Sequence, residues 1–132
     1  VGRHISIPYT LRVAPSSWLL AAGTGSGAAF CRDVHTVLGA RSPLSLKITL
    51  RHLRAAAAMD LKSTLEMDHR LASHCLAASD FHEGVRAVLV DKDKSPLWQP
   101  SRLEDIGADL VDQYFAKFDD QDLVLEGRER MT

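Results

Sequence analysis

The sequence has few of the residues and patterns that mark several classes of protein. Its 132 residues contain two cysteines, Cys31 and Cys75, too few for a disulfide framework. No run of about 18 apolar residues is present, so no membrane-spanning helix is expected. We therefore expect a chain of a reducing compartment, the cytoplasm, that has no membrane partner.

The chain also has no excess of charge of either sign. Sixteen basic and seventeen acidic residues leave a formal charge of −1. Such a balance offers no broad electrostatic surface for nucleic acid or anionic lipid, so neither is expected as a partner.

The apolar group at 18–22 is too short for a signal peptide, and Val1 in place of Met suits a processed or truncated product.

Metal-binding spacing is missing from the sequence as well. The six histidines occur singly, at His4, His35, His52, His69, His74 and His82. No two of them are four residues apart, and no closely spaced cysteine pair completes a ligand set. The sequence therefore predicts no metal site.

Residues 1–29 are predicted to be a linker or a poorly ordered segment. They contain Pro8 and Pro15, and no helical or strand period lasts more than a few residues. The glycine-rich run at 21–27 invites comparison with a phosphate-binding loop. No Gly-Lys-Ser/Thr follows it, however, and a flexible linker is favoured.

Helical periodicity dominates the remainder of the chain. The apolar spacing predicts a helix over 28–38, which Gly39 ends. From Leu44 to Leu50 the apolar residues alternate as in a strand, but Ser42 suits an N-cap, Pro43 suits the first helical position, and a run of alanines follows. We therefore predict a helix over 43–58.

Two further helices should form a helical hairpin or a sharp corner. Asp60 is predicted to cap a helix over 60–78. The apolar face of this helix is predicted to contain Leu61, Leu65, Leu71, Ala72, Cys75 and Leu76. The next helix should begin near Phe81, after a cap from Ser79 or Asp80, and end before Pro96. Its predicted apolar stripe contains Phe81, Gly84, Val85 and Val88, with Gly84 placed against a neighbouring helix.

The last predicted helix runs over 101–118 and completes the fold. Ser101 and Glu104 match a capping box, and Gly107 interrupts the apolar period. Residues 126–132 are predicted to be a frayed tail. The predicted fold class is all-α, with about five helices in a small irregular bundle.

Four ordered segments carry a resemblance to a known family. They are Ser-Pro-Leu-Ser-Leu-Lys-Ile-Thr-Leu at 42–50, Met-Asp-His-Arg-Leu at 67–71, Asp-Phe-His-Glu-Gly-Val-Arg-Ala-Val-Leu-Val-Asp-Lys-Asp at 80–93, and Ser-Pro-Leu-Trp at 95–98. Together they resemble the C-terminal part of the crotonase (enoyl-CoA hydratase/isomerase) superfamily, and most closely its 3-hydroxyisobutyryl-CoA hydrolases. The resemblance covers residues 30–125.

The resemblance implies a C-terminal helical region of an acyl-CoA thioester hydrolase of valine breakdown. It also implies a catalytic core upstream of the matching segments, so no catalytic residue is assigned in this chain, which is expected to be inactive alone. Acyl-CoA would bind through that core, and no cofactor is expected beyond the coenzyme A of the substrate. In a eukaryote the location would be the mitochondrial matrix. Two alternatives are the tail of a hydratase or isomerase and a freestanding helical module that self-associates through exposed faces.

Two groups of residues are candidates for a functional role. Lys92, Lys94 and Trp98 could contact the phosphates and adenine of coenzyme A. The lysines alternate with acidic residues, however, and we favour a solvated loop. Asp68 falls by helical angle on an apolar face. It is either a general acid or base with a raised pKa or, as we favour, a structural partner of Arg51, His52 or Arg54.

Overall fold

The computed structural model describes residues 27–118 and 122–126 and divides the chain into two units, 1–41 and 42–132. The first unit contains α2, Gly27–Gly39, where the sequence predicts a helix over 28–38. The second contains α3 (Pro43–Ala56), α4 (Leu61–Ala77), α5 (Ser79–Val85), the π-helix η1 (Arg86–Val90), the 3-10 helix η2 (Leu103–Asp105) and α6 (Ala108–Phe115). No strand occurs in these described ranges, which confirms the all-α prediction. The predicted linker, 1–29, lies outside the described ranges except for residues 27–29. The predicted tail, 126–132, lies outside them except for Glu126.

The ambiguous segment after Ser42 is a helix. The Ser42 side chain accepts a hydrogen bond from the backbone N–H of Ser45 at 3.1 Å, and Pro43 occupies the first turn. This cap outweighs the strand-like alternation. The helix ends at Ala56, two residues earlier than predicted, because the chain turns there before Asp60 caps α4 through the backbone N–H of Ser63.

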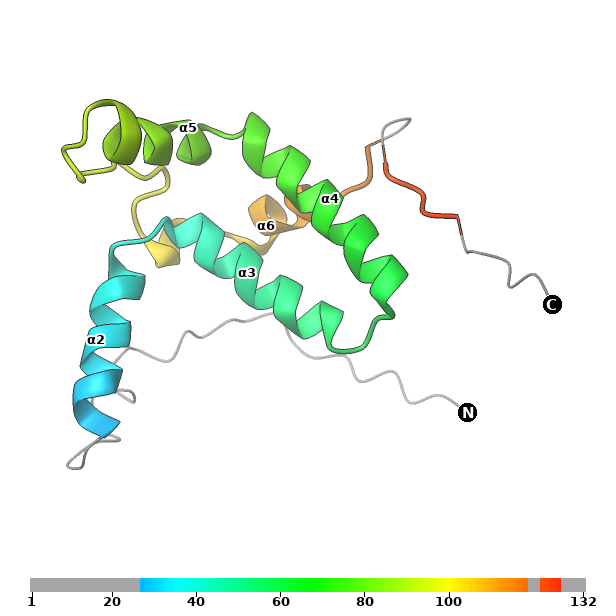
Figure 1. The fold of residues 1–132 in the computed structure, drawn as a ribbon, viewed down its shortest axis with the longest axis horizontal. Coiled ribbons are helices and arrows are strands. Elements are labelled where there is room, and N and C mark those ends of the chain that lie inside the picture. The colour runs from blue at the N-terminus through cyan, green and yellow to red at the C-terminus, as the bar shows by residue number, and fades with distance from the viewer. Residues whose placement is uncertain (1–26, 119–121, 127–132) are drawn as a thin grey trace. The chain divides into compact units, whose positions relative to one another are not determined.

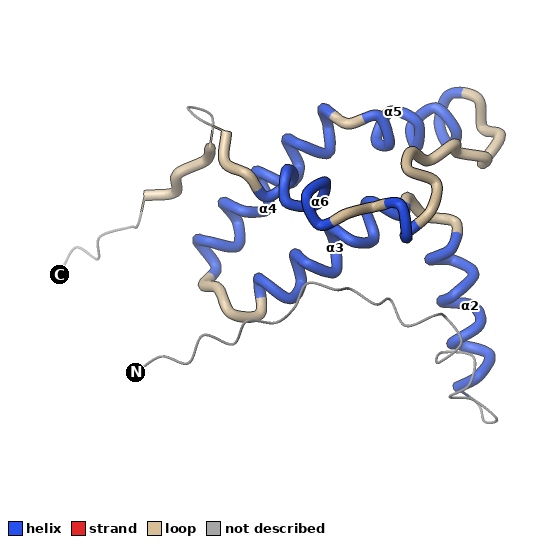
Figure 2. The backbone as a smooth tube through the Cα atoms, turned by 180° about the vertical axis from the view of Figure 1, so that it is seen from behind, coloured by secondary structure: helices blue, strands red, loops and turns tan. Residues whose placement is uncertain are grey.

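Helix α6 lies between α3 and α4, which diverge from their short connection at 57–60 (Figures 1 and 2). This arrangement buries a small apolar cluster made of Leu44 and Ile48 from α3, Met67 and Leu71 from α4, and Ile106 and Val111. Partly buried residues, among them Leu110 and Phe115, pack around it. The core of the second unit is therefore thin, and it is centred on α6.

The predicted apolar face of α4 is wrong at four positions, one of which is the exposed Ala72. Leu61, Leu65 and Leu76 are exposed by 75%, 43% and 54%, whereas Met67 and Leu71 are buried. Helix α6 packs against the side of α4 that carries the two buried residues, and the three leucines on the other side are left exposed.

The predicted cap of the next helix is also wrong. α5 begins at Ser79, its N-cap is Ala78, and no side chain caps it. The predicted close connection is present, since Ala78, in an extended conformation, is the one residue between α4 and α5. Phe81 and Val88, expected to be buried, are exposed, and the fully buried residue is Ala87. The change to π-helical geometry at Arg86 moves the following residues away from the predicted stripe.

The final predicted helix is broken as expected at Gly107, which is the N-cap of α6. The capping box is not formed, because η2 begins after Arg102 without a side-chain cap. α6 ends at Phe115, three residues before the predicted end at Phe118. None of the helices in the described ranges has both the length and the apolar character needed to cross a bilayer.

Candidate functional site

The Arg86 side chain is the centre of a polar network that holds the loop at 91–97 against α5 and η1. Its Nε and Nη2 donate to the two carboxylate oxygens of Glu83 at 2.9 and 2.8 Å. Its Nη1 donates to Asp91 Oδ2 at 2.6 Å and to Asp93 Oδ2 at 2.7 Å, and Nη2 also reaches the carbonyl oxygen of Ser95 at 3.3 Å. One guanidinium therefore binds three carboxylates. We call these four charged side chains the Arg86 cluster.

The Arg86 cluster changes the protonation behaviour of its members. Hydrogen bonds from Arg86 and from the backbone N–H of Leu97, at 2.7 Å, lower the pKa of Glu83 to about 2. The pKa of Asp93 is lowered as well, mainly by Arg86 and then by the backbone N–H of Ser95. The same contacts, with Glu83 first, raise the pKa of Arg86. Glu83, Asp93 and Arg86 are therefore charged at neutral pH.

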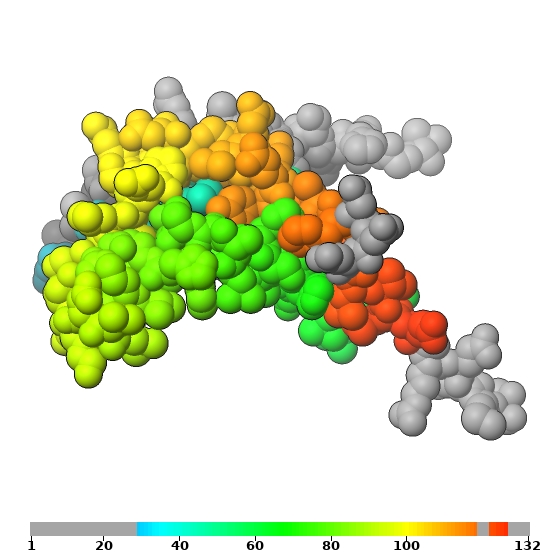
Figure 3. Space-filling model, turned by 90° about the horizontal axis from the view of Figure 1, so that it is seen from above, coloured from blue at the N-terminus to red at the C-terminus, as the bar shows by residue number. Residues whose placement is uncertain are grey.

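The predicted coenzyme A contacts Lys92 and Lys94 lie on this loop, and both are exposed. Their φ angles are 58° and 56°, in the left-handed region that favours glycine. The backbone N–H of Lys94 donates to the carbonyl oxygen of Ala87 at 3.0 Å and fixes the loop on η1. In the space-filling view, η1 and the loop form one end of the surface beside α4 (Figure 3).

Trp98, the third predicted contact, packs its indole ring against Gly84. A Cβ atom added at Gly84 would lie 3.3 Å from Cη2 of the ring. The close neighbour of this glycine is thus an aromatic side chain, where we predicted a helix. Trp98 is half-buried, so part of its ring serves packing. Its role as a ligand contact stays a prediction.

Asp80 has a role that sequence reasoning missed. Its Oδ2 accepts a hydrogen bond from Ser42 Oγ at 2.5 Å, and its Oδ1 accepts one from the backbone N–H of Gln99 at 3.1 Å. This buried carboxylate therefore joins the start of α3, the first turn of α5 and the chain before Pro100. No local pattern could reveal partners so distant in sequence. The Glu83–Arg86 pair, at helical spacing, was in contrast open to prediction.

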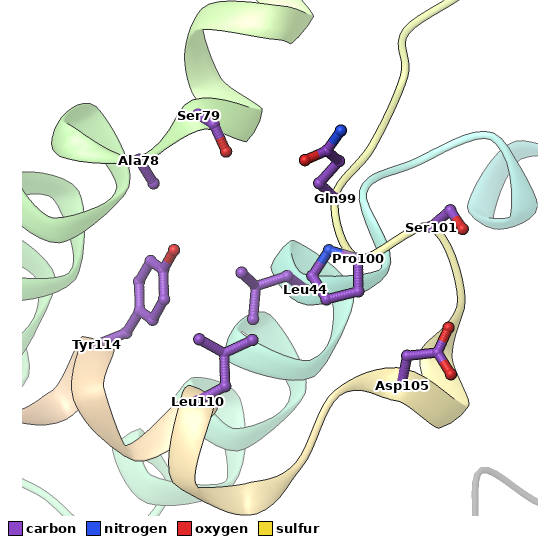
Figure 4. Close-up of a pocket in the computed structure, with 9 residues that line it drawn as sticks. All are labelled: Leu44, Ala78, Ser79, Gln99, Pro100, Ser101, Asp105, Leu110 and Tyr114. Atoms are coloured by element: carbon purple, nitrogen blue, oxygen red, sulfur yellow. The ribbon is translucent and has the colours of Figure 1, made fainter.

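An open pocket of about 740 Å³ lies next to this junction (Figure 4). Leu44, Pro100 and Leu110 give it an apolar side, and the Tyr114 hydroxyl points toward Ala78. Ser79, Gln99, Ser101 and Asp105 add polar groups. Burial raises the pKa of Tyr114, so its hydroxyl remains protonated at neutral pH. These lining residues include no basic side chain that could neutralise a phosphate.

Asp68 lies beside His52, one of its three predicted partners. His52 Nε2 is 2.5 Å from Asp68 Oδ1, but the two atoms are not aligned as a hydrogen bond. The Asp68 side chain is 45% exposed, so its surroundings are less apolar than the sequence suggested. Whether Asp68 acts as a structural partner or as an acid or base stays a prediction.

The described residues offer little catalytic equipment. They contain no group of three histidine, cysteine or acidic side chains suited to a metal. Ser42 is engaged with Asp80 and with its own helix cap, and within the same ranges no serine or cysteine side chain bonds to a histidine ring. Burial raises the pKa of the Cys75 thiol, which makes it a poorer nucleophile at neutral pH. The best-formed polar site is the Arg86 cluster with its loop.

Comparison with known proteins identifies the family. The family model for enoyl-CoA hydratase/isomerase matches residues 15–115. The chain belongs to this family. The chain is 43% identical over 99 residues to the mitochondrial 3-hydroxyisobutyryl-CoA hydrolase of Gallus gallus. The match covers 75% of this chain and 26% of that protein. The Homo sapiens protein of the same name is 41% identical over 97 residues, covering 74% and 25%.

A solved structure extends the family relationship to the fold. A carnitinyl-CoA dehydratase from Mycobacterium thermoresistibile matches with a TM-score of 0.70 and 33% identity, covering 85% of this chain and 31% of that one. The predicted membership of the crotonase group is thereby confirmed. The chain spans about a quarter of the length of the hydrolases that it matches.

Proposed function

We propose that this chain is the C-terminal helical part of a 3-hydroxyisobutyryl-CoA hydrolase-like enzyme of valine catabolism. The observation that carries the proposal is the identity of 41% to 43% with hydrolases of that name over three quarters of the chain. The reaction would be cleavage of a 3-hydroxyacyl-CoA thioester by water, giving the free acid and the coenzyme A thiol. Water is the only co-reactant, so no resident cofactor is proposed.

We further propose that the chain does not hydrolyse thioesters by itself. Its match covers a quarter of the hydrolases, and its described residues contain no nucleophile paired with a base. Apolar side chains left exposed on α3, α4 and η1, such as Leu53, Leu61 and Leu89, suit packing against a missing core. A mitochondrial matrix location is proposed for a eukaryotic source, because the matching hydrolases are named as mitochondrial.

The test is hydrolysis of 3-hydroxyisobutyryl-CoA, followed by release of the free thiol. The 132-residue chain should give no turnover, and the chain joined to a crotonase-type core should be active. Turnover by the isolated chain that a single substitution abolishes would contradict the proposal, because the chemistry would then reside here.

The dehydratase match gives a second candidate reaction. A protein of that name is 33% identical in a match that covers 85% of this chain. This favours the tail of a hydratase or isomerase as the alternative. The joined protein should then add water to a 2-enoyl-CoA, measured as loss of the conjugated absorbance, and should release no thiol. The two reactions are distinguished in one preparation.

The exposed apolar residues support a third candidate, a freestanding module that self-associates. Val88, Leu89 and Val90 are consecutive and are exposed by 55% to 68%. Sedimentation of the isolated chain separates the possibilities. A discrete stable dimer favours the module, whereas a monomer that binds a hydrophobic dye favours a helical part lacking its core.

A further inference from the structure

Lys92 and Lys94 alternate with Asp91 and Asp93 in sequence, and in a mobile loop neighbouring opposite charges would tend to cancel. The structure separates them. Both aspartates bind Nη1 of Arg86, at 2.6 and 2.7 Å. Among the described residues, no carboxylate forms an ion pair with either lysine. The acidic charge is therefore gathered on Arg86, and the two ammonium groups are left for solvent or a ligand.

The backbone conformation of the loop also depends on the carboxylates that bind Arg86. Lys92 and Lys94 both adopt left-handed φ angles, which L residues avoid because Cβ approaches the backbone carbonyl. Such conformations persist only where surrounding contacts determine them. Here those contacts come from the Lys94 N–H, which donates to the Ala87 carbonyl oxygen, and from two carboxylates. Asp93 accepts the Ser95 N–H, and Glu83 accepts the Leu97 N–H. Both carboxylates are also bound to Arg86.

We propose that Arg86 is a positioning residue. By binding Asp91 and Asp93, it leaves Lys92 and Lys94 unpaired and fixes them at the surface for the phosphate groups of an acyl-CoA. The identity of the ligand rests on the proposed function, whereas the charge separation rests on the contacts alone. An arginine is needed because its planar guanidinium presents five donors and can bind several carboxylates at once.

The test is an NMR titration of the ¹⁵N-labelled 132-residue chain with coenzyme A and, separately, with 3′-dephospho-coenzyme A. We expect amide shifts confined to 91–97 and a preference of about threefold to fivefold for coenzyme A, as one exposed ion pair provides. Arg86→Gln should reduce this preference to about one, since the freed aspartates would then pair with the lysines. Arg102→Gln is the matched control, because Arg102 is an exposed arginine whose acidic partner, Glu104, lies outside the loop.

A purely structural role for Arg86 would weaken binding of both ligands equally, so the ratio of affinities is the deciding quantity. Asp93→Asn is a milder variant that removes one acceptor of Arg86, and it should reduce the ratio even if Arg86→Gln does not fold. The double variant Lys92→Ala, Lys94→Ala should lose the preference while amide exchange in the loop stays slow.

Three results would overturn the inference. The first is an unchanged ratio of the two affinities in the folded Arg86→Gln or Asp93→Asn variant. The second is an equal loss of affinity for both ligands in these variants, and the third is no preference for coenzyme A in the unaltered chain. Failure of the proposed function has a different signature. If the preference depends on Arg86 while the chain joined to its core hydrolyses no 3-hydroxyacyl-CoA, the positioning role stands and the hydrolase proposal is wrong.

Discussion

Ser42 Oγ donates a hydrogen bond of 2.5 Å to Asp80 Oδ2, across 38 residues of sequence. The same hydroxyl oxygen accepts the Ser45 N–H that begins α3, so one atom caps a helix and binds a second element. The other oxygen of Asp80 accepts the Gln99 N–H. This pair therefore connects three separate segments of the second unit.

We expect Ser42→Ala to lower the free energy of unfolding by about 1–3 kcal/mol. The substitution removes the cap and leaves a buried carboxylate with one fewer donor. Urea denaturation followed by circular dichroism measures the change. Ser101→Ala is the control, since Ser101 is exposed, and it should stay within about 0.5 kcal/mol. Equal effects of the two substitutions would contradict the role assigned to the Ser42–Asp80 bond.

Acid should loosen the loop at 91–97 through Glu83. The pKa of Glu83 falls from an ordinary value of 4.5 to about 2 in the folded chain, first because of Arg86 and then because of the Leu97 N–H. A carboxylate with a lowered folded pKa stabilises the fold above its unfolded pKa, and this contribution is lost as the pH falls toward the folded value. Protection of the Leu97 amide from hydrogen exchange should therefore decline between pH 4.5 and about 2.

The matched variant for this prediction is Glu83→Gln. It removes a titrating acceptor, so protection of the Leu97 amide should be low at neutral pH and nearly independent of pH over the same interval. Asp93, whose pKa is also lowered, supplies any remaining dependence. Strong, pH-independent protection in the unaltered chain would show that Glu83 does not hold the loop.

Gly84→Ala should move the Trp98 ring. The new Cβ would approach Cη2 to 3.3 Å, so the ring must shift by a few tenths of an ångström. The gain in helix propensity, about 1 kcal/mol, should be offset by this displacement, leaving stability nearly unchanged. A shift in tryptophan emission, measured in a Trp18→Phe background, should report the movement. An unaltered spectrum with a full 1 kcal/mol gain would mean that the ring does not pack there.

Asp68→Asn tests the two interpretations of Asp68. If Asp68 pairs with His52 for structural reasons, the variant should lose at most about 1 kcal/mol of stability, because the carboxylate is nearly half exposed. His52→Gln should lose a similar amount, and the double variant should lose little more than either single one. Additive losses would show that the two side chains are not coupled.

Local patterns in the sequence were sufficient to predict most helices and two of the four side-chain caps. Ser42 and Asp60 cap as expected because the backbone N–H donors that they accept from, those of Ser45 and Ser63, lie only three residues along the chain. Asp80 was misjudged as a cap because its true partners come from distant segments. The break at Gly107 was predictable in the same local sense, whereas the π-helix at Arg86 was not signalled by the periodicity.

The ligand-contact role of the loop residues stays a prediction, and the organisation of the loop around Arg86 was not predictable from the sequence. Lys92, Lys94 and Trp98 were identified by type and position, yet the contact of Trp98 with Gly84 depends on how the chain returns after Pro96. The apolar faces were predicted least well. Helical period identifies apolar residues such as Leu61 and Leu76, but it cannot tell which of them find a partner within the described chain.

The π-helix has a consequence for how this chain tolerates insertions and deletions. Its bond from the Asp91 N–H to the Arg86 carbonyl spans five residues, one more than an α-helical bond. Removal of a single residue between them would allow a regular α-helix and rotate everything that follows by about 100°. The acidic side chains would then be carried around the helix away from the guanidinium, so the length of this short segment should be as restricted as its composition.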